Sequence, residues 1–219
     1  MKTCIVIPMK DPAKSKQRLA NVLDSDQRQN LALFLFRQTL VFLNSYFQYV
    51  PVVVVTPSKR IADIAAKYGV KTLIEDDEGL NNALTMAAEL NCRLGFESQL
   101  ILPADITDLR QSEIQVLLDY PRDKSSVLIC PAQDGGTNAL LTTPPNILPF
   151  SFGPDSSDVH QKLAFDKSVS CVRLDLEKLS FDLDTPDDLY HWKQGINTHT
   201  LFAANQEQAI SIFSVEETA

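Results

Sequence analysis

The sequence predicts an α/β fold in which helices flank a mixed, mostly parallel sheet. Apolar runs alternate with helix-forming stretches over roughly the first 130 residues, a pattern typical of right-handed βαβ units. The apolar runs are continuous, as expected for strands that are covered on both faces. A chain of 219 residues that is 44% hydrophobic suits one globular domain.

The predicted strands and helices follow one another in chain order. The strands are expected at Cys4–Met9, Val50–Thr56, Lys71–Glu75, Gln99–Asp105 and Val127–Pro131, with a sixth, antiparallel strand at Asn138–Thr143. The helices are expected from Asp24 or Ser25 to about Asn44, from Ser58 to Gly69, at Leu80–Leu90 and at Ser112–Tyr120. Ser58 is a typical helix N-cap, and Gly69 is a typical stop signal.

One helical stretch, Leu31–Leu43, is apolar almost all the way round, with Arg37 and Gln38 as interruptions. It is too short to span a bilayer. A helix of this kind is either deeply buried or part of a subunit contact. A homodimer is therefore one possible arrangement.

The charge balance narrows the classes of partner. The net charge of −8 and the pI near 4.8 argue against non-specific binding to nucleic acid or to a membrane surface, because the field of the protein repels phosphates. Met1 runs directly into the first predicted strand, so we expect no signal peptide and a cytoplasmic protein.

The four cysteines are Cys4, Cys92, Cys130 and Cys171, and they form no CxxC pair. Three of them, Cys4, Cys130 and Cys171, fall inside apolar strand-like runs. We therefore expect buried free thiols in a reducing compartment, and neither a zinc site nor a disulfide framework.

Three polar segments that carry glycine or acidic residues lie between the apolar runs, and we expect them to be loops at one edge of the sheet. They are Ala132–Leu141, Ser151–His160 and Phe181–Leu189. Gly135 and Gly136 would let the backbone approach a ligand closely. The hydroxyls of Thr137, Ser156 and Ser157, and backbone N–H groups near Gly153, could hold an anion. The Gly-Gly pair could equally be an ordinary turn.

The third segment carries two carboxylates, Asp182 and Asp184, which would face the same side of an extended strand. That side could hold a hard cation. The segment is also a good helix start whatever its function, with Thr185 as N-cap and Pro186 at the first helical position.

A basic loop follows the first predicted strand and carries Lys10, Lys14, Lys16 and Arg18. It is either a solvated loop or a clamp that neutralises a triphosphate and a leaving pyrophosphate. The sequence GxxxxGK[ST] is absent, which excludes a P-loop, and the first turn has no GxGxxG, which argues against a Rossmann dinucleotide site.

Asp105 ends the fourth predicted strand. Alone it could be a helix cap, but together with Asp182 or Asp184 it would form a Mg²⁺ site, since Mg²⁺ takes one or two carboxylates plus phosphate oxygens and water. The reaction would be nucleotidyl transfer, in which an acceptor phosphate attacks the α-phosphorus of a nucleoside triphosphate. The acceptor is already ionised, so no general base is needed, and His160 is expected to have a hydrogen-bonding or helix-face role.

At this point the sequence resembles a known family, the guanylyltransferases that begin assembly of the side chain of the deazaflavin coenzyme F₄₂₀. The resemblance covers about residues 3 to 193 and rests on segments in the family's order, namely Pro12–Leu19, Gly79–Leu84, Gly135–Leu141, Phe152–His160 and Asp182–Leu189. It implies a single-domain GT-A-like (Rossmann-like) nucleotidyltransferase fold. We place the domain at residues 1–196, followed by a tail or extra edge element at 197–219.

The resemblance also implies roles for individual residues. Asp105, Asp182 and Asp184 would hold Mg²⁺, and Thr137, Gly153 and Ser156 would hold the acceptor. The nucleotide GTP would contact Pro8, Lys10, Lys14, Arg18, Asn81, Pro103 and Gly136, with Asp105, Lys14 and Arg18 acting in catalysis. The acceptor would be phosphoenolpyruvate, 2-phospho-L-lactate or 3-phosphoglycerate, and the next enzyme of the deazaflavin pathway would receive the product.

Two departures from the family pattern bear on these roles. The chain continues as ITDL after the proline, alanine and aspartate at 103–105, and the KSKQ sequence carries an extra lysine. Two alternatives also stay open. One is a cytidylyl- or molybdopterin-type transferase, because Asn81 alone does not identify the base. The other is a nucleotide-binding or partner-binding domain without turnover.

Overall fold

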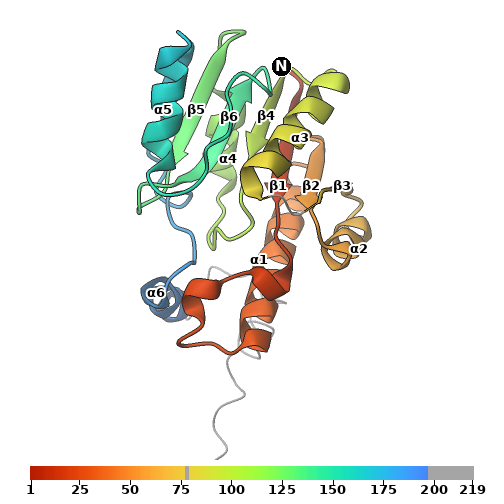
Figure 1. Cartoon of the computed structure of the whole chain (residues 1–219), viewed down its shortest axis with the longest axis vertical. Helices are drawn as coiled ribbons and strands as arrows, with labels where there is room; N and C mark the ends of the chain where they lie inside the picture. Colours follow the sequence, from red (N-terminus) through yellow and green to blue (C-terminus); the bar gives the residue numbers. More distant parts are fainter. Residues whose placement is uncertain (77–78, 197–219) are drawn as a thin grey trace, which may run out of the picture.

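The computed structural model of the protein describes residues 1–76 and 79–196, which form a three-layer α/β domain (Figure 1). Its sheet has seven strands in the order β3-β2-β1-β4-β6-β5-β7. The strands are β1 (Thr3–Pro8), β2 (Val52–Thr56), β3 (Lys71–Ile74), β4 (Ser98–Ile101), β5 (Ser126–Pro131), β6 (Thr137–Thr143) and β7 (Ser170–Arg173). Strand β6 runs antiparallel to β4 and β5, and the other neighbouring pairs are parallel.

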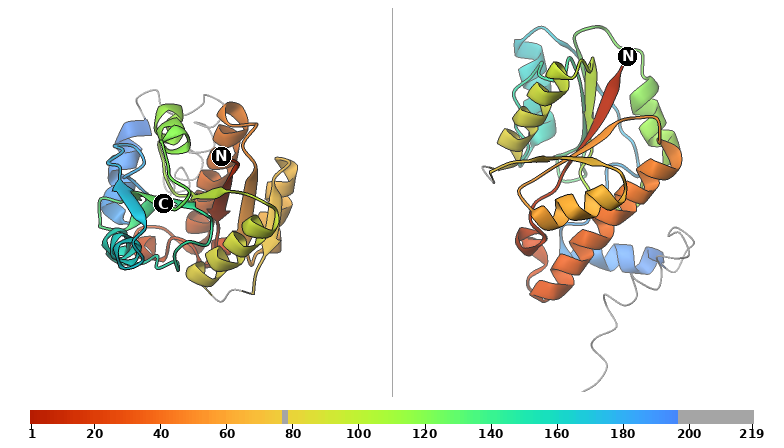
Figure 2. Two further views of the ribbon diagram at one scale, coloured as in Figure 1. Left: turned by 90° about the horizontal axis from the view of Figure 1, so that it is seen from above. Right: turned by 90° about the vertical axis from the view of Figure 1, so that its right-hand side faces the viewer.

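Helices cover both faces of this sheet (Figure 2). They are α1 (Ser25–Tyr46), α2 (Lys59–Lys67), α3 (Leu80–Arg93), α4 (Gln111–Asp119), α5 (Ser156–Asp166) and α6 (Pro186–Ile196), with 3-10 turns η1 (Pro12–Lys14) and η2 (Gln17–Leu19). Helices α1, α2 and α4 pack on one face, and α3 and α5 pack on the other. The predicted mixed, mostly parallel sheet flanked by helices is confirmed.

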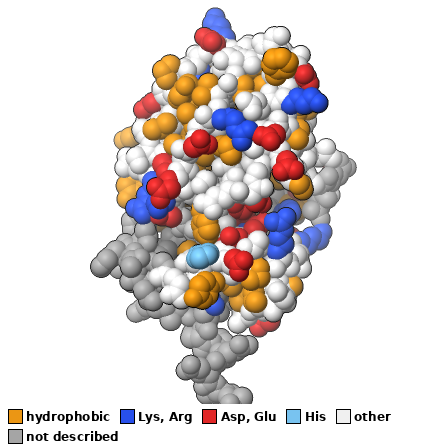
Figure 3. Space-filling model, turned by 90° about the vertical axis from the view of Figure 1, so that its left-hand side faces the viewer, with side chains coloured by type: hydrophobic (Ala, Val, Ile, Leu, Met, Phe, Trp, Pro, Cys, Tyr) orange, Lys and Arg blue, Asp and Glu red, His pale blue; other side chains and the backbone are white. Residues whose placement is uncertain are grey.

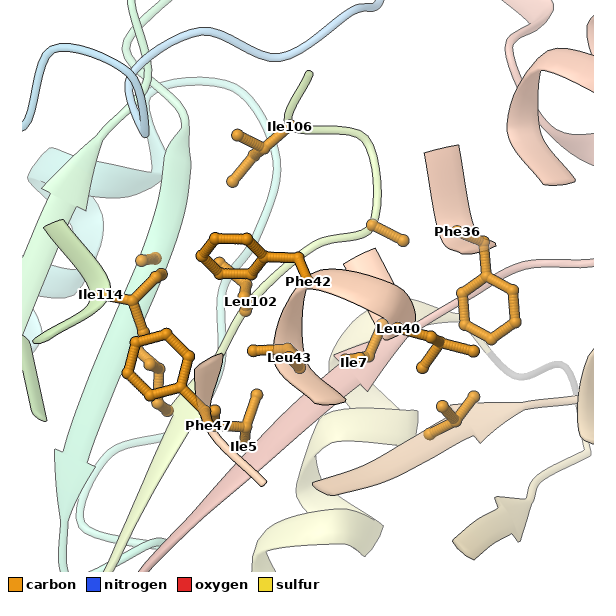
Figure 4. Close-up of a cluster of buried hydrophobic side chains, with 14 of the residues drawn as sticks. Ile5, Ile7, Phe36, Leu40, Phe42, Leu43, Phe47, Leu102, Ile106 and Ile114 are labelled. Carbon is orange, nitrogen blue, oxygen red and sulfur yellow. The ribbon is translucent and has the colours of Figure 1, made fainter. Parts of the chain in front are cut away.

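The larger hydrophobic core lies between the sheet and α1 (Figure 4). Ile5 and Ile7, two residues apart on β1, point to the same face and meet Phe36, Leu40 and Leu43 of α1. Their exposed fractions are 0% or 1%. Burying a side chain of this size contributes about 1.5–3 kcal/mol, so this contact fixes α1 against the strands whose carboxyl ends carry the site.

Helix α1 is apolar all round because it packs against two clusters within the chain. Phe36 faces the sheet, whereas Leu31, Phe34 and Leu35 belong to a separate cluster that includes Leu19 and Trp192. Intramolecular burial therefore accounts for this helix, and a homodimer stays a prediction. Within the described part of the chain, no helix combines the length and apolarity needed to cross a lipid bilayer.

Several local signals act as expected. Asp24, rather than Ser25, is the N-cap of α1, where its carboxylate accepts the Gln27 N–H and the Gln27 side chain accepts the Asp24 N–H. Ser58 is at the N-cap position of α2, although its side chain makes no capping bond. At the start of α6, the Asp188 carboxylate accepts bonds from the Thr185 N–H and hydroxyl.

Three local predictions need correction. Strand β4 ends at Ile101, so Asp105 lies on a loop rather than at the strand end. The segment expected to be a loop at Ser151–His160 is irregular only up to Asp155 and then begins α5, because its serine and acidic residues make a good first turn. Strand β7 was not predicted as an element. The tail predicted at 197–219 lies outside the described residues.

All four cysteines are free thiols, as expected. Cys4 and Cys130 are buried, and burial raises the pKa of each thiol to about 12. Cys171 is only partly buried, contrary to the prediction, because β7 is an edge strand.

Candidate active site

A cleft of about 720 Å³ lies along the carboxyl ends of the parallel strands. It is lined by the basic loop after β1, the loop after β4, the start of β6, the loop before α5 and the loop before α6. These are the segments that the sequence predicted at one edge of the sheet. Ligands bind at this edge in open α/β sheets.

The carboxylate cluster, formed by Asp105, Asp182 and Asp184, lies in this cleft, with one oxygen from each residue within 4.8 Å of the others. A short antiparallel bridge brings the two segments together. Ile106 pairs with Asp182, and the Leu183 N–H donates to the Asp105 carbonyl at 3.1 Å. The expected convergence of these carboxylates is therefore present, whereas metal binding stays a prediction.

The alternation of side chains explains why both later carboxylates face the cleft. Leu183, which lies between Asp182 and Asp184, is fully buried in the cluster that joins α1 and α6. Neighbouring side chains on an extended segment point to opposite sides. Burial of Leu183 therefore turns the two aspartates toward the cleft.

Lys16 is the cation in closest contact with the carboxylate cluster. Its Nζ lies 2.9 Å from Asp105 Oδ2 and 2.9 Å from Asp184 Oδ1, and its side chain is only 6% exposed. Burial alone would lower the pKa of Lys16, but the charges of Asp105 and Asp184 outweigh it and raise the pKa above its ordinary value. The ammonium is thus held as a charged counterion among the carboxylates.

Asp182 is a partly buried member of the cluster and has a neutral partner. Its Oδ1 accepts a hydrogen bond from the Asn138 side-chain amide at 3.0 Å. Burial, followed by the charge of Asp105, raises the pKa of Asp182 to about 6. Asn138 therefore orients a carboxylate that ionises near neutral pH.

The other predicted cations lie farther out. Arg18 is 62% exposed, and its Nη1 lies 3.8 Å from Asp184 Oδ2. Lys10 and Lys14 line the cleft from exposed positions on the same loop. On the face shown in Figure 3, acidic and basic side chains lie side by side in the lower part of the molecule. The loop can therefore present positive charge to an anionic ligand.

Hydroxyl groups form a second region of the cleft. Thr137 and Ser156 are both buried, and their hydroxyl oxygens are 3.0 Å apart. A Cβ at the neighbouring Gly136 would lie 2.9 Å from Asp134 Oδ1, so the Asp134 side chain would have to shift to admit one. Gly153 has φ of +148°, which few other residues adopt, so its backbone can line the cleft closely.

Most of the predicted site residues line the cleft, including Pro8, Pro103, Gly136 and Gly153. Asn81 does not. Both ends of its amide bond the backbone of Phe152: Oδ1 accepts the N–H at 2.8 Å, and Nδ2 donates to the carbonyl at 3.3 Å. In this structure Asn81 holds the loop that precedes α5, and its contact with the nucleoside stays a prediction.

The structure also places residues in the site that the sequence did not single out. Lys16 was recognised only as one member of the basic loop, and Asn138 was assigned only to a strand. Glu75, immediately after β3, is a buried carboxylate that lines the cleft. The sequence signal available for these residues was a polar side chain next to a buried strand end. Many such side chains only cap a helix or form a turn.

The donor set suits a hard divalent cation. Carboxylate oxygens are the ligands that Mg²⁺ and Mn²⁺ prefer, and three of them converge here. Lys16 donates to two of the same carboxylates, so a bound cation and the ammonium would compete for them. The residues present therefore fit a divalent metal, provided that Lys16 can give way.

Two solved structures with related folds are named as transferases. A putative nucleotide-diphospho-sugar transferase from Desulfovibrio desulfuricans G20 aligns with a TM-score of 0.70 at 17% identity, over 96% of this chain and 94% of that chain. A cytidylyltransferase from Leptospira borgpetersenii aligns with a TM-score of 0.60 at 17% identity, over 100% of this chain and 99% of that chain. At these identities the likeness supports the fold alone.

Sequence relatives are more informative. The chain is 51% identical to a 3-phospho-D-glycerate guanylyltransferase from Colwellia psychrerythraea, over 86% of this chain and 90% of the relative. It is 32% identical to a phosphoenolpyruvate guanylyltransferase from Sphaerobacter thermophilus, over 86% and 91%. The family model described as "Guanylyl transferase CofC like" matches residues 3–200. This chain therefore belongs to the CofC-like guanylyl transferase family.

Proposed function

We propose that this protein transfers GMP from GTP to a phosphorylated three-carbon acid, with pyrophosphate as the other product, and that it depends on a divalent metal such as Mg²⁺. The observation that carries the proposal is the carboxylate cluster, which lies in the same cleft as the hydroxyls of Thr137 and Ser156. Metal ligands and anion-binding donors would then serve two phosphorylated substrates in one site.

The cleft is long enough for both substrates. It runs from β3 to β6, and strands β2, β1 and β4 lie between them. Four strand spacings correspond to roughly 19 Å. We assign the nucleoside to the β3 end and the acid to the β6 end, with the reacting phosphates beside the carboxylate cluster.

The β3 end has a group suited to guanine. Glu75 is buried and lines the cleft, and a carboxylate can accept hydrogen bonds from both N1–H and the exocyclic amine of guanine. The corresponding edges of adenine and cytosine present a different pattern of donors and acceptors. Glu75 is therefore our candidate for base selection, in addition to the predicted contact of Asn81 with the nucleoside.

The reaction forms one bond and breaks another. A phosphate oxygen of the acid attacks the α-phosphorus of GTP, and the bond from that phosphorus to the bridging oxygen of the β-phosphate breaks. When bound, the divalent ion would neutralise charge on the phosphates. Lys16, Arg18 and the exposed Lys10 and Lys14 would stabilise the negative charge of the leaving pyrophosphate, and the site supplies this mainly by positioning.

The experiment measures pyrophosphate release by the purified protein. GTP, ATP, CTP and UTP are each combined with 3-phosphoglycerate, phosphoenolpyruvate and 2-phospho-L-lactate, with Mg²⁺ or with EDTA. We expect release with GTP and Mg²⁺, and 3-phosphoglycerate is tried first because of the 51% identical relative. Turnover with another nucleotide in preference to GTP, or unchanged turnover in EDTA, would contradict the proposal.

The product would be a mixed diester that joins GMP to the acid through a reactive phosphoanhydride. We therefore propose that the next enzyme, a transferase that joins this unit to a deazaflavin acceptor, takes the product directly. The yield of the joined product should be higher when both enzymes are mixed from the start than when the transferase is added after the first enzyme has been removed. Equal yields under the two conditions would count against direct transfer of the product.

A further inference from the structure

A buried histidine lies directly behind the two hydroxyls of the cleft. His160, on α5, is 0% exposed. Its Nε2 lies 3.1 Å from the Ser151 N–H nitrogen, and its Nδ1 lies 3.1 Å from Thr137 Oγ1. The Ser156 hydroxyl is in turn 3.0 Å from the same Thr137 oxygen. We call Thr137, Ser156 and His160 the hydroxyl network.

The backbone bond fixes the tautomer of the imidazole. A backbone N–H can only donate, so Nε2 must accept from Ser151 and carries no proton. Burial lowers the pKa of His160 to about 4, so the ring is neutral at physiological pH and its single proton is on Nδ1. The Nδ1–H group therefore donates to the Thr137 hydroxyl oxygen.

The remaining protons can be counted. Thr137 and Ser156 have one hydroxyl proton each, and the Ser156 proton is used in the bond that it donates to Thr137 Oγ1. Since the imidazole already donates to Thr137, the other hydroxyl proton is left to donate into the cleft that both residues line. The network thus offers a donor to a ligand oxygen, which favours a carboxylate or phosphate over a cation.

We propose that His160 is a positioning residue for acceptor binding, which sets the Thr137 and Ser156 hydroxyls so that one of them donates to an anionic oxygen of the phosphorylated acid. This inference rests on the proposed function, because it assumes that the acid occupies this end of the cleft. His160 itself acts through the hydroxyls, since the ring is fully buried behind them.

Two substitutions separate hydrogen bonding from packing. His160→Phe retains an aromatic ring near Phe152, whose centroid is 5.0 Å from that of the imidazole, but removes both hydrogen bonds. His160→Gln can accept from the Ser151 N–H through its carbonyl and donate to Thr137 through its amide. We expect Phe to raise the KM for the acid at least about tenfold while the KM for GTP changes less than about twofold, with Gln restoring much of the loss.

A double substitution tests whether His160 acts through Thr137. Thr137→Val alone should raise the KM for the acid, and adding His160→Phe should raise it little further. An unchanged KM for the acid in His160→Phe, an equal rise in both KM values, or two fully additive effects would each overturn the proposal.

A spectroscopic measurement on the wild-type protein tests the network even if the variants do not fold or the proposed reaction fails. In ¹⁵N-histidine NMR spectra, His160 should show the Nδ1–H tautomer and remain neutral down to about pH 5. Adding 3-phosphoglycerate should shift its Nδ1 resonance, with the exposed His191 as an internal reference. An Nε2–H tautomer, or no shift with 3-phosphoglycerate, phosphoenolpyruvate or 2-phospho-L-lactate, would contradict the proposal.

Discussion

The two regions of the cleft hold their polar groups in opposite ways. The carboxylate cluster is charged and partly exposed, and it is held by an ammonium from a distant loop. The hydroxyl network is neutral and buried, and it is held by a backbone N–H. In the carboxylate cluster, one cation can replace another, because any cation is attracted to the carboxylates. In the hydroxyl network, buried neutral hydrogen bonds fix the positions of the hydroxyls before any ligand binds.

This difference means that the two regions respond differently to ligands. The carboxylate cluster can exchange Lys16 for a divalent cation, so its arrangement depends on what is bound. The hydroxyl network has one arrangement, set by the tautomer of His160. We therefore expect substitutions in the first region to change metal binding and turnover, and substitutions in the second to change the affinity for the acid.

The largest effect is expected for Asp105→Asn. This change keeps the shape of the side chain but removes a charge from the carboxylate cluster, so kcat should fall by at least about 10²–10³-fold. Pyrophosphate release at saturating substrates measures the loss. Asp63→Asn, at an exposed position on α2, is the matched control and should leave kcat unchanged. Equal rates for wild type and Asp105→Asn would show that the cluster is not where the reaction occurs.

Lys16→Gln tests the carboxylate cluster by removing the ammonium that contacts it. Without the ammonium, the carboxylates lose a competitor for a divalent ion, so Mn²⁺ affinity measured by electron paramagnetic resonance should rise roughly tenfold in the absence of nucleotide. Thermal unfolding should show a larger increase in Tm on adding Mg²⁺ than in the wild type.

Lys14→Gln is the control for this change, because it removes the same charge from the same loop at a position that is exposed. Its Mn²⁺ affinity should rise much less. If Lys16→Gln bound Mn²⁺ no more tightly than Lys14→Gln, Lys16 and the metal would not be alternative occupants of the carboxylate cluster.

A smaller effect is expected from pH. The pKa of Asp182, raised to about 6 in the folded protein, means that this carboxyl binds a proton more tightly in the folded state than in the unfolded state. Without metal, its contribution to the free energy of unfolding is therefore greatest at low pH and is lost as pH rises through about 6. The affinity for Mn²⁺ should fall several-fold as the pH is lowered from 7 to 5, because protonation removes the charge of Asp182. In Asp182→Asn this part of the pH dependence should disappear, whereas a persistent profile would assign it to another group.

The smallest effect on stability is expected for Arg18→Gln. Ion pairs of exposed side chains contribute about 0–1 kcal/mol, so urea unfolding should give nearly the wild-type free energy. The KM for GTP should still rise, because the guanidinium is placed to meet the phosphates. A large loss of stability would mean that Arg18 holds the loop rather than the nucleotide.

Much of the fold was predictable because its signals are local. The apolar run at Cys4–Met9 became the buried strand β1, and Asp24 caps α1 with the help of Gln27. The predicted strand extends past the observed end of β4, because Leu102 and Ala104 are apolar and buried like the strand residues before them. An apolar run in the sequence does not by itself distinguish a buried loop from a strand.

The site was predictable in part. Asp182 and Asp184 were expected on one side of an extended segment, and Leu183 between them is buried on the other side. His160 was expected to have a hydrogen-bonding or helix-face role, and the sequence contained no sign that its partners would be Thr137 and Ser151. Its pKa and tautomer follow from those partners and from burial.

The sequence by itself determined the alternation of strands and helices, the segments that meet at one edge of the sheet, and the residue types available there. Periodicity and capping depend on neighbours a few residues apart, so they can be read along the chain. Only the tertiary structure decided that Lys16 reaches Asp105 and Asp184, which are 89 and 168 residues away. Such contacts depend on how closely packed helices and strands bring separate loops together, and the order of residues alone does not specify those distances.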